Sequence, residues 1–324
     1  MRLLVAGGTG VIGRSIARHA LASGCAVVTT SRNPVGDGVL PPGVEHAVCD
    51  RQDYGAFAAL VHRIQPDAVI DLACFSALDA WSAVEACGDK PRYVCCSSVA
   101  VQKVRPGRVD ERTPADSTRP YGRGKIVAER VLRDAAAAGR LRSVVARPSI
   151  VFGPGGQLPR QTGDLRPWVH RVRRGKPILV IDDGAARCQL LFADDAARAL
   201  FGLATVFCDE FGVFTVAPRE SCTWRDYHTL VARCIGREPS FASASMAELL
   251  ALDPVQFDES DELSGHDVVF DTSALEAALP GWQPCVGMAD AIMRTMEALN
   301  EEEVTVDLEG QLIAILARRR AIDA

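Results

Sequence analysis

A glycine-rich turn near the start of the chain constrains its fold more than any other feature. The turn follows a short apolar run at residues 3–6 and precedes residues 12–23, whose apolar side chains recur at helical spacing. A strand that enters a helix through such a turn is the first half of a βαβ unit. The free N–H groups at the start of that helix favour the phosphates of a dinucleotide. The sequence therefore predicts a dinucleotide site formed by Gly7, Thr9, Gly10, Val11, Ile12 and Gly13.

The alternation of strands and helices continues through the first half of the chain. Further strands are expected at residues 26–30, 44–48, 68–72, 93–96 and 143–146, and helices at residues 56–64 and 126–138. Strands that alternate with helices in this way pair in parallel and are covered by helices on both faces. The pattern predicts an α/β fold built on a Rossmann-type, doubly wound parallel sheet.

The residues after the second expected strand indicate which dinucleotide binds. An acidic side chain at this point binds the 2′-hydroxyl of NAD. This chain has Ser31 and Arg32 there and no acid, a combination that suits a 2′-phosphate and favours NADP over NAD. A solvated loop residue is the alternative for Arg32. Asp50 and Arg51 end the third strand and are expected near the adenine, with an Asx-turn as the alternative for Asp50.

Two further segments are candidates for the chemistry. Tyr121 and Lys125 lie four residues apart and share one face of an expected helix. A phenol has a pKa near 10, and a neighbouring ammonium lowers it, so the pair predicts an acid–base group. Ser98, at the end of the fifth strand, is expected to polarise a substrate carbonyl. Its neighbour Ser97 is expected to cap the strand end.

Composition excludes several other classes of protein. The net charge of −5 over 324 residues disfavours a general nucleic-acid binder. No apolar stretch is long enough to span a bilayer. The eleven cysteines include no Cys-x-x-Cys pair, so we expect no metal site and free thiols in a reducing, cytoplasmic setting.

Taken together, these motifs resemble the short-chain dehydrogenase/reductase superfamily, and in particular its extended, epimerase/dehydratase-like branch. Three other segments strengthen the resemblance, namely residues 109–114, 146–155 and 192–197. They are similar to the family's acidic loop, its Arg-Pro…Gly-Pro segment and its Asp-Asp strand-to-helix junction.

The resemblance implies a role for each matching residue. Ser98 would bind the carbonyl, Tyr121 would act as acid–base, and Lys125 would be its pKa partner and would hold the nicotinamide ribose. Pro148 and Ser149 would lie beside the nicotinamide. Arg187 would bind the diphosphate of a nucleotide-linked sugar, the alternative being a surface arginine in a turn.

The second half of the chain is less regular. We expect residues 1–155 to form the dinucleotide-binding core, with its sheet completed by later strands near 178–216. Residues 156–324 would then form mainly a substrate-binding lobe and C-terminal helices. The segment 71–92 is shorter than in extended family members, which leaves a homodimer open.

Three functions remain open from the sequence. The first is an NADPH-dependent reductase of a carbonyl on a nucleotide sugar or related metabolite. The second is a nucleotide-sugar epimerase or dehydratase that retains its NAD(P). The third is a non-catalytic, RNA-binding relative, which the intact tyrosine–lysine pair and the acidic charge disfavour.

Overall fold

The computed structural model describes residues 1–103, 106–163, 168–206, 211–299 and 307–323. Its largest element is a parallel sheet with the strand order β12-β7-β5-β4-β1-β2-β3. These strands are β1 (Arg2–Ala6), β2 (Ala26–Ser31), β3 (Glu45–Val48), β4 (Ala68–Asp71), β5 (Arg92–Cys96), β7 (Arg142–Pro148) and β12 (Gly212–Val216). The chain winds outward from β1 in both directions, which confirms the predicted doubly wound α/β fold.

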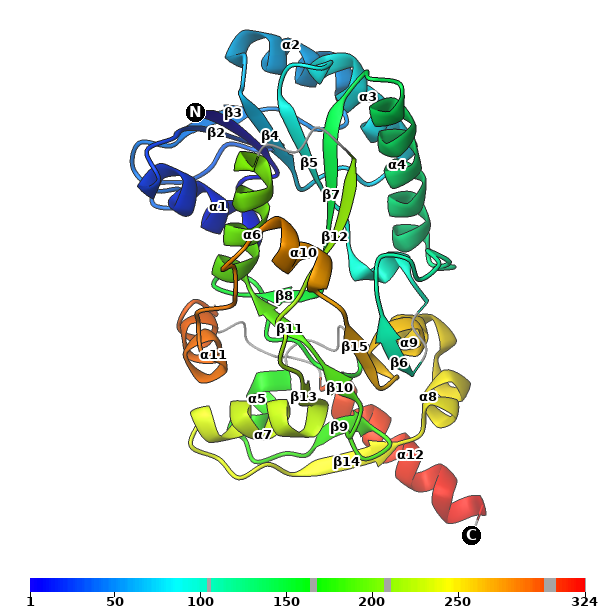
Figure 1. The fold of residues 1–324 in the computed structure, drawn as a ribbon. Coiled ribbons are helices and arrows are strands. Elements are labelled where there is room, and N and C mark those ends of the chain that lie inside the picture. The colour runs from blue at the N-terminus through cyan, green and yellow to red at the C-terminus, as the bar shows by residue number, and fades with distance from the viewer. Residues whose placement is uncertain (104–105, 164–167, 207–210, 300–306, 324) are drawn as a thin grey trace.

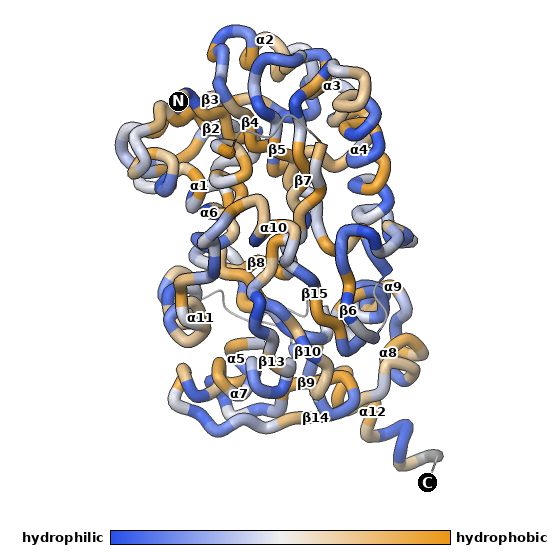
Figure 2. Tube along the Cα trace, viewed as in Figure 1, coloured by the Kyte–Doolittle hydropathy of each residue, from blue (hydrophilic) through white to orange (hydrophobic). Residues whose placement is uncertain are grey.

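Helices cover both faces of this sheet (Figure 1). One face carries α1 (Val11–Ala22), α6 (Ala193–Thr205) and α10 (Ser273–Ala278). The other carries α2 (Tyr54–Ile64), α3 (Ala77–Cys87) and α4 (Pro120–Ala137). Figure 2 shows hydrophobic residues concentrated along the central strands. Successive residues of β1 alternate between the two layers: Leu3 packs into one and Leu4 into the other, and both are fully buried.

The second half of the chain forms a lower lobe of small two-stranded sheets (Figure 1). The paired strands are β6 (Gly107–Val109) with β15 (Val268–Phe270), β8 (Ile150–Phe152) with β11 (Leu190–Phe192), β9 (Ile178–Ile181) with β14 (Phe241–Ala244), and β10 (Arg187–Cys188) with β13 (Cys222–Thr223). The remaining elements are η1 (Val99–Val101), α5 (Trp168–Arg173), α7 (Trp224–Cys234), α8 (Met246–Leu252), α9 (Pro254–Glu259), η2 (Ser260–Ser264), α11 (Met288–Glu297) and α12 (Leu308–Asp323).

Two expectations about the elements need correction. Of the strands expected between residues 178 and 216, only β12 joins the main sheet, because β9 pairs with β14 and β11 with β8. The helix expected at residues 126–138 begins earlier, at Pro120. Proline is favoured in the first turn of a helix because its missing N–H has no partner there. Tyr121 therefore lies in the first turn of α4.

Within the described residues, no helix is long and apolar enough to cross a membrane.

Candidate active site

The glycine turn lies between β1 and α1, beside the point where the strand order reverses. The N–H groups of Gly7 and Gly8 donate to Thr30 O, and Gly7 has a φ of +80° that favours glycine. A Cβ on Gly13 would lie 2.6 Å from Gly7 O, so Gly13 allows the helix to pack closely. A Cβ on Gly10 would meet only Gly7 O, at 3.5 Å. No side chain of the described residues fills the space beside Gly10, so a bound group such as a phosphate can approach its backbone.

The first turn of α1 provides a place for an anion. Gly10 is the N-cap and has no side chain to satisfy the first amides of the helix. The first helical hydrogen bond runs from Arg14 N to Gly10 O. The preceding N–H groups of Val11, Ile12 and Gly13 have no partner within the helix. These donors and the positive end of the helix dipole suit a pyrophosphate, and Thr9 lies in the same turn.

The end of β2 lacks an acidic side chain, as the sequence indicates. Arg32 is exposed and makes no hydrogen bond or ion pair with any described residue. The hydroxyl of Ser31 donates to Asn33 O at 2.7 Å and lies 3.1 Å from His46 Nε2. Arg32 is thus the more available of the two for an added phosphate.

The two residues after β3 differ from each other. The carboxylate of Asp50 accepts from Gln52 N at 3.0 Å, which is the Asx-turn geometry. Arg51 is only 4% exposed, and its Nε donates to Asp71 Oδ2 at 2.7 Å. A second guanidinium nitrogen donates to Asp79 O. The interpretation of the Arg51 side chain as an adenine contact is therefore corrected, because its guanidinium is buried in the protein interior.

Ser98, Tyr121 and Lys125 come together at the lower end of the main sheet. Ser98 caps η1, and its hydroxyl oxygen accepts from Ala100 N at 3.1 Å. Its O–H hydrogen faces the Tyr121 oxygen, and a hydrogen bond there favours the phenolate. Tyr121 is 43% exposed, whereas Lys125 is 1% exposed and its Nζ donates to Cys96 O at 2.6 Å. The site therefore combines a partly exposed phenol, that of Tyr121, with a buried ammonium, that of Lys125.

The electrostatics of this trio differ from the sequence-based expectation. Burial raises the pKa of Tyr121 above its ordinary value, and the opposing effects of Lys125 and the Ser98 hydrogen bond are smaller. Burial lowers the pKa of Lys125, but Cys95, Tyr121 and Cys96 raise it, and the net shift is upward. The phenol is therefore protonated and the lysine charged at neutral pH. The expectation of a lowered tyrosine pKa is therefore corrected.

Phe75, in the loop after β4, is a site residue that the sequence reasoning missed. Lys125 Nζ lies 4.4 Å from the centre of the Phe75 ring, and the Phe75 and Tyr121 rings are 6.2 Å apart. Gly124 permits this contact, because a Cβ there would collide with the Phe75 carbonyl oxygen. No periodic pattern marks Phe75. The glycine between Tyr121 and Lys125 was the available signal of a close approach.

A buried network supports the strand end that carries Ser98. Ser97 Oγ donates to Glu129 Oε1, and Arg147 binds both oxygens of the same carboxylate at 3.0 and 2.6 Å. All three side chains are at least 95% buried. Ser97 is thus held in a buried structural network through Glu129 of α4, where the sequence predicted a cap of the strand end.

The segment just before Tyr121 is held by the lower lobe. Glu262, on η2, accepts from Ser117 Oγ at 2.7 Å and from Thr118 N at 3.0 Å. Arg119 forms ion pairs with Asp258 and Glu259 at 3.1 and 3.3 Å. These contacts connect residues more than 130 positions apart and position the first turn of α4. They could not be predicted from local sequence.

Pro148 is the last residue of β7, and Ser149 follows it at the lower end of the sheet. Ser149 N donates to Val216 O at 2.9 Å, whereas Ser149 Oγ is buried and has no hydrogen-bond partner. A buried hydroxyl without a partner is costly, which fits a polar group of a ligand at this point.

A cavity of about 200 Å³ lies next to this segment. Its lining includes Ile150, Val151, Gln157, Arg160, Glu259 and Ser264.

Arg187 lies in the lower lobe and is paired with an acid. Its Nε and Nη2 donate to the two carboxylate oxygens of Asp267 at 2.6 and 3.0 Å. The Arg187 backbone N–H donates to the same carboxylate at 3.1 Å. The Arg187 hydrogen bond lowers the pKa of Asp267. Asp267 therefore occupies the Nε–Nη2 edge of the guanidinium, one of the two edges through which an arginine binds a phosphate with two hydrogen bonds.

Comparison with known proteins identifies one family and several relatives. The profile of the NAD dependent epimerase/dehydratase family matches residues 3–86 and 76–209. The 2′-dehydrokanamycin reductase of Streptomyces kanamyceticus is 34% identical over 284 residues, which cover 87% of this chain and 80% of that protein.

Solved structures of sugar-nucleotide epimerases share the fold. The UDP-glucuronic acid 4-epimerase of Bacillus cereus with NAD has a TM-score of 0.74 at 17% identity, and covers 92% of this chain and 98% of its own. The UDP-glucose 4-epimerase of Thermotoga maritima with UDP-glucose has a TM-score of 0.71 at 19% identity, with the same coverage.

Proposed function

We propose that this chain, which belongs to the NAD-dependent epimerase/dehydratase family, reduces a ketone on a sugar-derived substrate with a nicotinamide cofactor. Membership of the family confirms the resemblance predicted from the sequence. The direction of the reaction, the form of the cofactor and the substrate are our inference. The observation that carries the proposal is the Ser98–Tyr121–Lys125 trio with a protonated phenol at its open side.

Ser98, Tyr121 and Lys125 each have a separate role in the proposed reduction of the carbonyl. When bound, the nicotinamide would supply the hydride to the carbonyl carbon. Ser98 donates a hydrogen bond to the carbonyl oxygen, and Tyr121 transfers its proton to that oxygen as negative charge develops. The ammonium of Lys125 stabilises the phenolate that remains. A protonated phenol is the form that a reductase needs at the start of turnover.

The glycine turn and its surroundings fit a dinucleotide. The three N–H groups at the start of α1 that have no partner within the helix suit the pyrophosphate, and the buried Ser149 hydroxyl suits a polar group of the nicotinamide. Arg32 would bind a 2′-phosphate, which favours NADP. NADPH is the form that serves net reduction in most cellular chemistry, in agreement with the proposed direction.

The Arg187–Asp267 pair favours a substrate without a diphosphate. Asp267 occupies the Nε–Nη2 edge of Arg187, the residue that the family resemblance assigns to the diphosphate. One relative, 34% identical over 87% of this chain, is named 2′-dehydrokanamycin reductase. A ketone of the 2′-dehydrokanamycin type is therefore our first candidate. A nucleotide sugar is the second, favoured by the solved structures that share the fold.

One experiment separates net reduction from epimerisation or dehydration. The purified protein is denatured and any released nucleotide is identified by mass. The native protein is then assayed with NADPH and 2′-dehydrokanamycin, and in parallel with UDP-glucose. We expect no retained nucleotide and one NADPH consumed per ketone reduced. Retained NAD or NADP together with conversion of UDP-glucose, without net consumption of NADPH, would overturn the proposal in favour of an epimerase or dehydratase.

Substitution of Arg32 by aspartate should weaken NADPH binding much more than NADH binding. The change places a carboxylate where the 2′-phosphate is expected, so we predict a loss of at least about tenfold in NADPH affinity, or roughly 1.4 kcal/mol. NADH affinity should change by less than about twofold. Both are measured by fluorescence titration. Arg63→Asp, an equal charge change on α2 beside the N-terminal ends of β2 and β3, is the control. Equal losses for both nucleotides would contradict the assignment.

Asp267 should govern whether the site responds to a nucleoside diphosphate. We expect millimolar UDP to leave ketone reduction by the wild-type protein unchanged. Asp267→Ala should release Arg187 and create inhibition by UDP, because a free guanidinium binds phosphate through two hydrogen bonds. The double variant Asp267→Ala/Arg187→Ala should lose that inhibition again. Strong inhibition of the wild-type protein by UDP would instead support the nucleotide-sugar candidate.

A further inference from the structure

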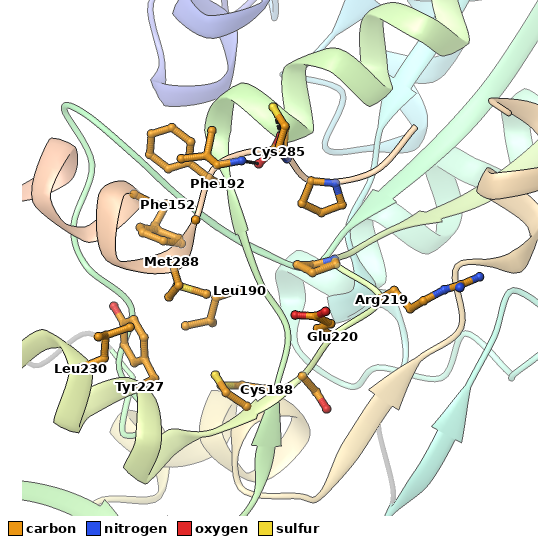
Figure 3. Close-up of a pocket in the computed structure, with 18 of the residues that line it drawn as sticks. Phe152, Cys188, Leu190, Phe192, Arg219, Glu220, Tyr227, Leu230, Cys285 and Met288 are labelled. Carbon is orange, nitrogen blue, oxygen red and sulfur yellow. Dashed lines mark hydrogen bonds between the residues drawn. The ribbon is translucent and has the colours of Figure 1, made fainter. Parts of the chain in front are cut away.

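A second and larger cavity lies in the lower lobe, and none of Ser98, Tyr121 and Lys125 lines it. Its volume is about 580 Å³, and α7, α11, the start of α6 and the strands β10, β11 and β13 surround it (Figure 3). Among its lining residues are three cysteines. Cys188 and Cys222 belong to β10 and β13, and Cys285 lies at the end of the cavity opposite Cys188 (Figure 3).

Cys188 and Cys222 are placed for a bond to each other. They are direct partners in the antiparallel pair β10–β13, and their sulfur atoms are 3.8 Å apart. Both are free thiols. Directly opposed residues in such a pair have Cα atoms about 4.5–5.5 Å apart, and a disulfide needs about 4.4–6.8 Å. A disulfide can therefore form by rotation of the two side chains, without movement of the strands.

The two sulfurs differ in reactivity. Cys188 is 6% exposed, whereas Cys222 is partly exposed at the cavity wall. The hydrogen bond between the two thiols lowers the pKa of Cys222 and raises the pKa of Cys188. Cys285, the third thiol of the cavity, differs from Cys222 because burial raises its pKa. The accessible sulfur of the pair thus has the greater thiolate character, and the thiolate is the nucleophile.

We propose that Cys222 and Cys188 form a redox modification site for hydroperoxides that enter the 580 Å³ cavity. The Cys222 thiolate attacks one oxygen of hydrogen peroxide, the O–O bond breaks, and the leaving hydroxide takes up a proton to become water. Cys222 is then a sulfenic acid. The Cys188 sulfur attacks it, the S–S bond forms, and the hydroxyl group leaves as water with the Cys188 proton. The two cysteines lose two electrons and the peroxide gains them.

The disulfide would tie together two parts of the substrate-side lobe. It joins the strand that carries Arg187 to the strand that leads into α7, across 34 positions of sequence. A link of this length restricts the unfolded chain and so stabilises the folded one. We expect the oxidised protein to melt about 5 °C above the reduced protein.

The test uses the full-length reduced protein and hydrogen peroxide in small excess. Remaining thiols are alkylated, and the protein is analysed by intact mass and peptide mapping. We expect one disulfide between Cys188 and Cys222, reversed by dithiothreitol, and the rise in melting temperature given above. Cys74 and Cys95 form a second hydrogen-bonded thiol pair, but both are fully buried and should remain reduced.

Three variants separate this reaction from general oxidation. Cys188→Ser should stop at the sulfenic acid on Cys222, trapped by dimedone, and Cys222→Ser should form neither product. Cys285→Ser, which removes the exposed thiol of the same cavity, should leave the disulfide unchanged. The proposal is overturned if dimedone first traps a sulfenic acid at Cys285. It is also overturned if the wild-type peptide map shows no Cys188–Cys222 disulfide. The wild-type map decides the question even if a variant does not fold.

Discussion

Tyr121→Phe should reduce turnover by a factor of about 10²–10⁴, the usual contribution of a positioned acid–base group. The change removes only the hydroxyl. The ring contact with Phe75 at 6.2 Å and the helical position of residue 121 are kept, so the affinity for NADPH should change by less than about twofold. Turnover is measured as NADPH consumption under saturating ketone, and affinity by fluorescence titration of the same samples.

The pH dependence gives a second readout of the same residue. The pKa of Tyr121 is raised above its ordinary value near 10, so its phenol stays protonated through the neutral range. Ketone reduction by the wild-type protein should therefore be flat across neutral pH and fall only in strongly alkaline solution. Oxidation of the product alcohol, which needs the phenolate, should rise with pH. Tyr121→Phe should remove both dependences.

Tyr54→Phe provides the matched control for this prediction. Tyr54 lies on α2, and its hydroxyl donates to Asp79 at 3.3 Å, outside the candidate site. Its variant should keep turnover within about twofold of the wild type. If Tyr121→Phe also kept its turnover, another group would supply the proton, and the assignment of Tyr121 as the acid would be wrong.

The site residues that could be predicted from sequence are those whose signal is local. The glycine turn follows directly on a strand, and Tyr121 and Lys125 are one helical turn apart. Phe75 and Glu262 reach the site from distant parts of the chain and have no such pattern. Phe75 enters through a loop, and Glu262 binds Ser117 across 145 positions. Only the folded chain brings these residues beside Tyr121.

Arg51 illustrates the opposite error. A cation just after a strand is compatible with an exposed ligand contact and with a buried ion pair, and the sequence does not distinguish them. Its partner Asp71 lies at the end of another strand, 20 positions away, and is fully buried.

The strands of the lower lobe were also difficult to predict from the sequence. Strands of two to four residues, such as β10 and β13, are too short to show a period.

Glu129→Ala should lower the free energy of unfolding by about 3–5 kcal/mol, because it leaves the guanidinium of Arg147 buried without its counter-ion. Both side chains are at least 96% buried, and Arg147 Nη1 already lacks a hydrogen-bond partner. The change also removes the acceptor of the Ser97 hydroxyl. Urea unfolding, followed by circular dichroism at constant pH, measures the loss.

Two controls separate the buried charge from the loss of side-chain volume. Glu85→Ala breaks the exposed pair with Arg140 and should cost no more than about 1 kcal/mol, because exposed ion pairs contribute little. The double variant Glu129→Leu/Arg147→Met removes both buried charges and should recover most of the stability lost in Glu129→Ala. If Glu129→Ala cost no more than Glu85→Ala, water would have to reach Arg147, and the network would not be the rigid support of the Ser98 strand end. If the double variant regained stability but not turnover, the carboxylate would be needed to position Ser98 as well as to neutralise Arg147.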